Sequence, residues 1–438
     1  MDTPTNGMRP VGASIELTRA QRRRAITAAI LGNGLEFYDF LTFAFFAIQI
    51  GHTFFPSDNH YLSLMGALAT FGAGFVTRPL GANILGGYAD RRGRKPAMLI
   101  SMSMMGAGIV LLALTPGYAT ISYAAPVIAV CARLIQGFAL GGEVGCATIY
   151  MMESSATDQR GLTMSWQGAS QSVSASIGAL VGLGLSLVLS ESDLSAYGWR
   201  IALLLGASIV PVALYIRASL PETIHQADTA SVEDGSLSTY IRPVVCGFLC
   251  MMTATIGTYI FQYMATYGQN SIHLPASTSM AGEFANNGIA VISIIVGGWL
   301  SDKYGRRSVM IGPQIVFCLV IVPSFLWLTT ERDAFSFIGA NLILSATQGF
   351  MYGAVYAAVS ESIPKRVRAR VFALVYSIPV ALFGGTTQLV VTWLLHVTGD
   401  PMSVAWYLTA IAVIGLGSMI AMRESAPAKL SLASAAVA

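Results

Sequence analysis

The sequence predicts an all-α polytopic membrane protein with twelve transmembrane helices in two parallel six-helix repeats and both termini in the cytoplasm. Three observations lead to this fold class. Only 11% of the 438 residues are charged, 54% are apolar, and the mean hydropathy is +0.63. Apolar segments of about 20 residues, the length that spans a bilayer as a helix, recur along the chain. A charged ten-residue pattern also occurs twice, about half a chain apart.

The composition excludes several other classes of protein. A soluble domain carries about 25% charged residues, more than twice the fraction here. The 44 glycines have no fixed period, which excludes a collagen-like chain. The net charge of +3 does not indicate nucleic acid, because the basic residues serve as membrane anchors. The five cysteines lack a zinc or redox spacing, so we expect no metal and no cofactor.

Twelve apolar segments are long enough to cross the membrane. They are continuous rather than alternating, which favours helices over a β-barrel. In chain order the predicted spans are 26–50, 61–86, 97–115, 122–149, 162–189, 199–219, 241–267, 280–301, 309–329, 335–360, 367–393 and 402–422.

The distribution of Lys and Arg orients these spans. With the N-terminus inside, 21 of the 25 basic residues fall in cytoplasmic segments and two in outer loops, which is a strong positive-inside signal. No cleavable signal peptide is evident in the first 25 residues, so the first helix is expected to direct insertion. The predicted parts are a cytoplasmic tail over 1–25, a bundle over 26–219, a cytoplasmic linker over 220–240, a second bundle over 241–424 and a tail over 425–438.

The duplicated pattern is G-x-x-x-D-[RK]-x-G-R-[RK], and it lies in two short cytoplasmic loops. Six helices separate the copies, which predicts two parallel repeats with a substrate site at their interface. Each Asp can accept hydrogen bonds from arginines or a helix N-terminus across the seam, so we interpret the loops as a cytoplasmic latch. A plain basic anchor loop is the alternative. The latch residues are Gly86, Asp90, Arg91, Gly93 and Arg94 in the first copy and Asp302, Gly305 and Arg306 in the second.

A second apparent repeat has the form E-x6-R. It pairs Glu153 with Arg160 in the first half and Glu361 with Arg368 in the second half. We predict that these residues also belong to the latch, with membrane anchoring as the alternative.

The doubled loop motif resembles the signature of the major facilitator superfamily, and Arg133-Leu134-Ile135-Gln136-Gly137 is similar to its R-x-x-x-G motif. The segments 32–40 (GNGLEFYDF) and 141–143 (GGE) resemble the metabolite:proton symporters. Ser165-Trp166-Gln167-Gly168-Ala169-Ser170-Gln171, with segments near 115–118, 136–138, 383–385 and 397–400, is similar to citrate and tricarballylate symporters. The resemblance covers roughly 25–423. It implies a twelve-helix proton-coupled transporter of the bacterial inner membrane.

Charges inside the bilayer are costly, at about 2.5–3.5 kcal/mol each at a helix centre, and therefore mark candidate functional residues. Arg133 and Asp39 form the leading proton-coupled pair, with Glu36 or Glu143 as alternative carboxylates. Sugar porters of the superfamily use a similar pairing. A fixed buried salt bridge is the other interpretation. Arg78 is the best candidate for substrate contact, since a guanidinium binds a carboxylate in bidentate geometry. Alternatively, Arg78 pairs with Glu36 or Asp39.

Polar stripes on two helices supply further substrate candidates. Spacing places Gln167 and Gln171 on one face of the fifth span, and Tyr259, Gln262 and Tyr263 form a similar face in the seventh. The alternative for the fifth span is packing between helices, and that for the seventh is a set of interfacial residues near the outer boundary. Remaining candidates are Arg133 and Gln136 for substrate and, more weakly, Asn286, Asn287 and Gln388, whereas Glu283 is expected to be a surface residue that snorkels to the outer boundary.

The sequence therefore predicts a secondary transporter that takes up a small organic anion, most plausibly citrate or another di- or tricarboxylate, with protons. The partners are the anion, protons and the lipid bilayer, without nucleic acid. No G-x-x-x-x-G-K-[ST] sequence is present, so ATP coupling is not expected. A symporter for another metabolite (2-oxoglutarate, shikimate, proline or betaine) and an efflux antiporter are the alternatives. No nucleophile or histidine cluster supports an enzyme.

Overall fold

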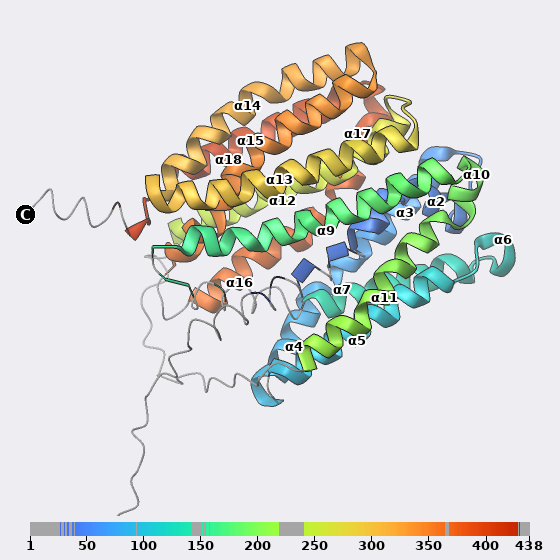
Figure 1. The fold of residues 1–438 in the computed structure, drawn as a ribbon, viewed down its shortest axis with the longest axis horizontal. Helices are drawn as coiled ribbons and strands as arrows, with labels where there is room; N and C mark the ends of the chain where they lie inside the picture. Colours follow the sequence, from blue (N-terminus) through green and yellow to red (C-terminus); the bar gives the residue numbers. More distant parts are fainter. Residues whose placement is uncertain are drawn as a thin grey trace, which may run out of the picture.

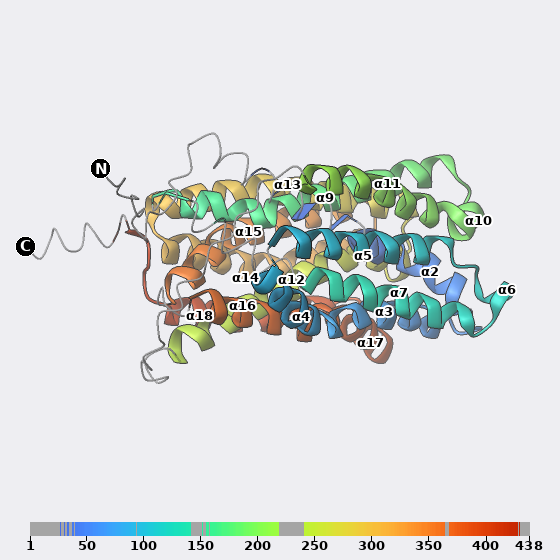
Figure 2. The same cartoon turned by 90° about the horizontal axis from the view of Figure 1, so that it is seen from below.

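In the computed structural model all regular secondary structure in the described part of the chain is helical (Figure 1). It comprises residues 40–92, 94–141, 158–218, 241–363 and 368–427. It also includes Thr27, Ile30, Asn33, Gly34, Phe37, Tyr38, Met151, Ser155, Ala156 and Lys429. The helices form two bundles that lie side by side, one built from the first half of the chain and one from the second (Figures 1 and 2).

The first bundle contains both long helices and short connecting ones. Its elements are α2 (Ala47–Phe54), α3 (His60–Val76), α4 (Arg78–Arg92), α5 (Arg94–Leu114), α6 (Tyr118–Ile121), α7 (Ala124–Gly141), α9 (Arg160–Val188), α10 (Glu191–Asp193), the π-helix η1 (Leu194–Gly198) and α11 (Trp199–Ala218).

The second bundle has fewer interruptions. Its elements are α12 (Ile241–Asn270), α13 (Ala276–Tyr304), α14 (Arg306–Glu331), α15 (Ala334–Glu361), α16 (Arg368–Pro379), the π-helix η3 (Val380–Gly384), α17 (Thr387–Thr398) and α18 (Ser403–Ala421).

Eight helical segments within the described residues are long and apolar enough to cross a membrane. Two predicted spans are less regular than the sequence suggests. The span predicted over 61–86 is divided at Thr77 into α3 and α4 and continues to Arg92. The span predicted over 367–393 contains η3, which starts directly after Pro379. Proline lacks an N–H donor, and the resulting local change of hydrogen-bond pattern accounts for a π segment at this position.

The two halves share their apolar cores. The core cluster of the first bundle also includes Tyr259 and Met280 from the second. The largest cluster of the second bundle includes Leu64 and Leu68 from α3. Helices α9 and α13, one from each half, pack against each other more extensively than any other pair in the described part of the chain. The seam between the halves is therefore a packed interface.

Glycines allow α3 and α4 to approach α7 closely. A Cβ atom at Gly137 would overlap the carbonyl oxygen of Gly74, and one at Gly141 would overlap that of Arg78. Small residues are the usual means by which membrane helices reach such short separations. The R-x-x-x-G motif thus combines a buried arginine, Arg133, with a glycine one turn later that permits the helix contact.

We predict that Gly137→Ala lowers the thermal stability of the detergent-purified protein. The added methyl group meets backbone rather than a movable side chain, and overpacking of this kind costs about 1–3 kcal/mol. The control is Gly184→Ala on α9, where an added Cβ meets nothing within 4 Å. Equal melting temperatures for the two variants in a fluorescence thermal-shift assay would contradict the prediction.

Candidate functional site

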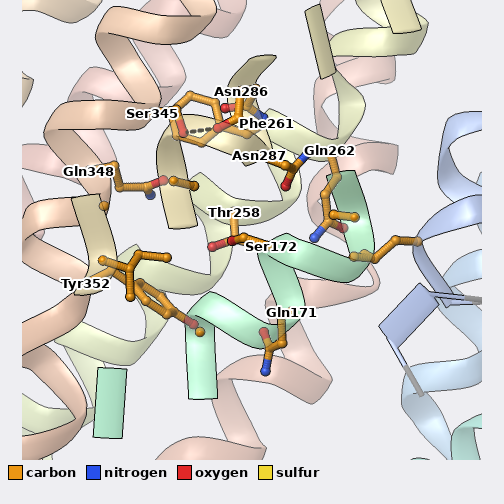
Figure 3. A pocket seen from close by; sticks show the side chains of 16 residues that line it. Gln171, Ser172, Thr258, Phe261, Gln262, Asn286, Asn287, Ser345, Gln348 and Tyr352 are labelled. Atoms are coloured by element: carbon orange, nitrogen blue, oxygen red, sulfur yellow. Dashed lines mark hydrogen bonds between the residues drawn. The ribbon is translucent and has the colours of Figure 1, made fainter. Parts of the chain in front are cut away.

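A polar cavity lies between the halves, where α9 faces α12, α13 and α15 (Figure 3). About 540 Å³ in and around it is free of atoms, a volume that includes open solvent. None of the described residues that line it is an acid or a base. The polar lining residues are Gln171, Ser172, Thr258, Gln262, Asn286, Asn287, Ser345, Gln348 and Tyr352.

In several of these amide groups one atom has no hydrogen-bond partner among the described residues. The atoms concerned are Nε2 of Gln171, Nε2 of Gln348, Oε1 of Gln262 and Oδ1 of Asn286. An unpaired buried polar atom costs about 1–3 kcal/mol. A ligand with hydroxyl and carboxyl groups would satisfy these donors and acceptors, so the cavity has the chemistry of a polar binding site.

The predicted substrate residues divide into two groups. Gln171 and Gln262 line the cavity. Gln167 instead donates from Nε2 to Oδ1 of Asn33 at 2.9 Å, and so connects α9 to another part of the first half. The Tyr263 hydroxyl accepts a hydrogen bond from Thr392 at 2.9 Å. In the structure Gln167 and Tyr263 thus make contacts between segments and do not line the cavity.

Arg78 and Arg133 lie in a cluster of aromatic rings in the first bundle. The Arg78 guanidinium lies 4.6 Å from the ring centre of Phe40 and 4.1 Å from that of Phe75. The Arg133 guanidinium lies 4.5 Å from both Phe40 and Phe43. Both arginines are buried. Cation–π contacts therefore stabilise two positive charges in the interior of the bundle.

This arginine–aromatic cluster extends to the second half through Tyr259. The ring centres of Phe75 and Tyr259 are 5.3 Å apart, and Tyr259 follows Thr258, which lines the cavity. Gln136 accepts a hydrogen bond from Arg133 at 2.6 Å, so its carbonyl oxygen is directed at the arginine. Nε and Nη2 of Arg78 have no hydrogen-bond partner among the described residues.

The predicted proton-coupling carboxylates cannot be placed. Glu36, Asp39 and Glu143 lie outside the described residues, so their pairing with Arg133 remains a prediction. For the same reason the geometry does not decide whether Arg78 contacts substrate or one of these acids.

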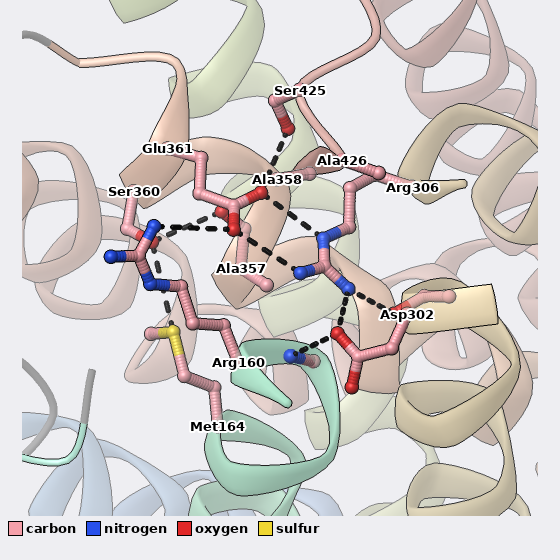
Figure 4. A network of polar contacts seen from close by, with 12 residues as sticks. Arg160, Met164, Asp302, Arg306, Ala357, Ala358, Ser360, Glu361, Ser425 and Ala426 are labelled. Atoms are coloured by element: carbon pink, nitrogen blue, oxygen red, sulfur yellow. Dashed lines mark hydrogen bonds and ion pairs between the residues drawn. The ribbon is translucent and has the colours of Figure 1, made fainter. Parts of the chain in front are cut away.

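At one end of the seam, four of the predicted latch residues meet (Figure 4). The Asp302 carboxylate accepts hydrogen bonds at 2.8 Å from the backbone N–H groups of Gly161 and Leu162, in the first turn of α9. Arg306 donates to Asp302 at 2.6 Å and to both oxygens of Glu361 at 3.1 Å. A helix N-terminus carries partial positive charge, which stabilises the carboxylate. Asp302 therefore joins the two halves.

The fourth of these residues is Arg160, whose Nη1 lies 3.9 Å from Oε1 of Glu361. The cluster also contacts the segment after α18. Glu424 accepts hydrogen bonds from the N–H groups of Arg306 and Arg307, at 2.9 and 3.1 Å, and thereby caps α14. The Ser425 hydroxyl donates to Glu361 at 3.1 Å. We call Arg160, Asp302, Arg306 and Glu361 the latch cluster, and the end of the bundle where they lie the latch end.

The other predicted latch residues lie elsewhere in the described helices or outside the described residues. Gly305 has a φ of +98° between α13 and α14, a conformation suited to glycine. Gly93 and Glu153 lie outside the described residues. The remaining positions lie in helices whose backbone is described although their side chains are not, namely Gly86, Asp90 and Arg91 in α4, Arg94 in α5 and Arg368 in α16.

Contacts also join the halves at the opposite end. The ring centres of Tyr61 and His396 stack 3.8 Å apart, and Nε2 of His60 lies 3.4 Å from Oδ1 of Asn270. Tyr61 and His60 belong to the first half, and their partners belong to the second. Contacts between the halves therefore flank the cavity at both ends.

Glu283 is not the surface residue that we expected. Its side chain is fully buried, with 0% exposure, near the start of α13. The helix begins at Ala276, about one turn earlier than the span predicted from 280, so Glu283 lies deeper than its sequence position suggested.

Known proteins resemble this chain in sequence and in fold. The family model of the major facilitator superfamily matches residues 29–378. The chain belongs to the major facilitator superfamily. It is 36% identical over 408 residues to the citrate-proton symporter of Salmonella typhi, covering 92% of this chain and 94% of that one. It is 30% identical to the proline/betaine transporter of Salmonella typhimurium, covering 92% of this chain and 84% of that one.

The fold of this superfamily member is also similar to solved structures. The crystal structure of the D-xylose-proton symporter matches with a TM-score of 0.76 and 17% sequence identity, covering 92% of this chain and 98% of that one. At this low identity the match supports the fold alone.

Sequence reasoning missed the contribution of α15 to the cavity of this superfamily member. Ser345, Gln348 and Tyr352 line it from three successive turns. Their spacing of three and four residues is that of one helix face. The same test for a polar stripe that found Gln171 would have found these residues.

We predict that Arg306→Ala lowers the melting temperature of the purified protein strongly. Arg306 is 1% exposed and Glu361 5%, so the substitution leaves a buried carboxylate whose remaining described cation is Arg160, at 3.9 Å. Breaking a buried ion pair costs about 3–5 kcal/mol. The control is Lys303→Ala, since Lys303 is an exposed cation near the end of α13. A thermal-shift assay in which the two variants melt together would refute the structural role of Arg306.

Proposed function

We propose that this protein is a proton-coupled symporter that takes up a small organic anion with two or three carboxylates, by alternating access. The amide-lined cavity at the seam between the halves carries the proposal. It lies where two parallel repeats would alternately expose a substrate. The identity to a citrate-proton symporter over most of both chains supports a carboxylate as the substrate. In this proposal the protein has twelve spans in the bacterial inner membrane, and both termini and the latch end are cytoplasmic.

The charge distribution around the cavity favours an anion. The described lining is neutral, but Arg78 lies buried in the neighbouring arginine–aromatic cluster, which extends to the second half through Tyr259. Nε and Nη2 of Arg78 have no hydrogen-bond partner among the described residues, so they can donate to a carboxylate of the substrate. A zwitterion such as betaine gains less from this contact, because it also carries a positive charge. The tricarboxylate assignment therefore ranks above the proline/betaine alternative, and both rank above an efflux antiporter.

Proton coupling follows from the energetics of anion entry. Moving one negative charge inward against a potential of 100 mV, negative inside, costs about 2.3 kcal/mol. Co-transported protons neutralise this charge. We propose that Asp39, paired with Arg133, carries a proton, with Glu36 and Glu143 as the other carboxylates. Loss of an arginine contact in a low-dielectric interior favours the protonated acid, which couples proton binding to conformation.

Uptake of labelled citrate into proteoliposomes tests the function. We expect an inward proton gradient to drive accumulation, and tricarballylate rather than betaine to compete. In the same assay Asp39→Asn should lose uphill accumulation but keep exchange between internal and external citrate, because the neutral amide mimics the protonated acid. Competition by betaine alone would establish the zwitterion alternative. Proton-driven accumulation at the wild-type level in Asp39→Asn would remove Asp39 from the coupling mechanism.

The cavity lining gives a second prediction. Gln348→Leu replaces the side-chain amide with an apolar group of similar size. The Nε2 atom that is lost has no hydrogen-bond partner among the described residues. A hydrogen bond to a charged ligand contributes about 1.5–3 kcal/mol, so the KM for citrate should rise by roughly 10- to 100-fold. Thr347→Val, at the half-buried neighbouring position outside the cavity lining, is the matched control. An unchanged KM in Gln348→Leu would exclude Gln348 from substrate contact.

A further inference from the structure

Glu283 is a buried carboxylate that the proposed coupling mechanism does not use. It lies on α13 of the second half, in its second helical turn, and has 0% exposure. Burial of an ionised carboxylate in an apolar environment is strongly unfavourable unless other groups compensate its charge. The groups around Glu283 therefore decide in which protonation state it is stable.

The described contacts of Glu283 are neutral hydrogen-bond donors. Oε1 accepts from the backbone N–H of Ala265 at 3.1 Å, and Oε2 accepts from the side-chain amide of Asn287 at 3.2 Å. Among the described residues no Lys, Arg or His forms an ion pair with Glu283. Its carboxylate thus lacks a cationic partner within the part of the chain that the structure describes.

Charged groups lie at both ends of the neighbouring helices, and Glu331, Arg332 and Asp333 are at the same end as Glu283. Asp302 is 19 residues from Glu283 on the same helix, which corresponds to about 28 Å at 1.5 Å per residue. The basic and acidic groups of the helices that pack against α13 are at or near helix ends. Those at the latch end are Arg160 on α9, Arg242 on α12, Arg306 and Arg307 on α14 and Glu361 on α15. Glu331 is the last residue of α14, at the end opposite the latch.

The titratable tyrosines of these helices make other contacts. The hydroxyl of Tyr263 bonds Thr392, and that of Tyr267 donates to Pro401 O at 3.1 Å. Tyr352 and Tyr356 bond each other at 2.6 Å. Tyr259 packs on Phe75, and His273, in the loop between α12 and α13, is exposed.

The position of Glu283 connects it to both the cavity and the seam. Met280, Glu283 and Asn287 are spaced by three and four residues, so they share one face of α13. Met280 contacts the first half, since its Sδ would lie 3.0 Å from a Cβ atom at Gly182 on α9. Asn287 lines the cavity and donates to Glu283. Separation of α13 from α9 at the end opposite the latch would therefore bring water to Glu283.

We propose that Glu283 is a second proton-binding site, in the C-terminal half, which takes up a proton when the end of the seam opposite the latch opens and holds it while the cavity is closed. Protonation neutralises the carboxyl group and leaves it an O–H donor. The proton comes from water that enters between α9 and α13. Asn287 links the protonation state of Glu283 to the cavity, because a protonated carboxyl group and a carboxylate present different hydrogen-bonding groups to its amide.

This inference rests on the proposed proton symport, and the test separates the two. We would measure the pH dependence of citrate affinity by thermal shift for the wild type, Glu283→Gln and the exposed control Glu331→Gln. If the citrate affinity of the wild type falls as the pH rises, the affinity of Glu283→Gln should equal it at low pH. The fall in affinity toward high pH should be at least about threefold smaller in Glu283→Gln than in the wild type. Glu331→Gln should follow the wild type. A wild-type pH profile in Glu283→Gln would overturn the proposal while leaving symport intact.

A second measurement uses the unaltered protein, in case Glu283→Gln fails to fold. Dicyclohexylcarbodiimide modifies protonated carboxyl groups in apolar surroundings, and mass spectrometry of the peptide that contains Glu283 would report the extent of labelling. We expect labelling of Glu283 near neutral pH and no labelling of the exposed Glu331. Absence of the label on Glu283 at every pH at which the protein transports citrate would overturn the proposal. Failure of the proposed function itself would appear as absence of proton-driven citrate uptake by the wild type.

Discussion

The contact between α9 and α13 is the constraint on which the rest of the structure depends. These helices come from different halves, yet they run together along the seam (Figure 1). At the latch end Gly161 and Gly298 permit their backbones to approach, and Asp302 binds the N-terminus of α9. At the other end Met280 packs on Gly182. The cavity exists because polar and small side chains replace tight packing between these two contacts.

The polar groups of the seam differ in how completely they are satisfied. Arg306 donates to Ser301, Asp302 and Glu361, so its own hydrogen-bonding groups are well satisfied. In the cavity, the described amides of Gln171 and Gln348 keep unpaired atoms. A satisfied network favours one arrangement of the halves, whereas unpaired groups can be completed by a ligand. This difference agrees with the proposed function, in which the latch cluster joins the halves and the cavity binds substrate.

The sequence predicted the latch cluster better than the cavity, for physical reasons. Asp302 and Arg306 are charges at a helix end, where a short repeated motif makes them visible without knowledge of the packing. Cavity residues are identified by which face of a helix turns to the seam, and periodicity gives this for Gln171 but does not distinguish it from the packing role of Gln167. Glu283 was misjudged because its depth depends on where α13 begins, and hydropathy locates helix ends only to within a few residues.

One uninterrupted helix carries all three elements of the proposed mechanism. From Ala276 to Tyr304, α13 holds Glu283 near one end, Asn286 and Asn287 at the cavity, and Asp302 at the latch. A continuous helix moves largely as a rigid body, so tilting it away from α9 at one end need not break the contact at the other. With the latch intact, such a tilt would expose the cavity and Glu283 to the same side of the membrane. Substrate and proton would then enter from one compartment, which is the requirement for symport.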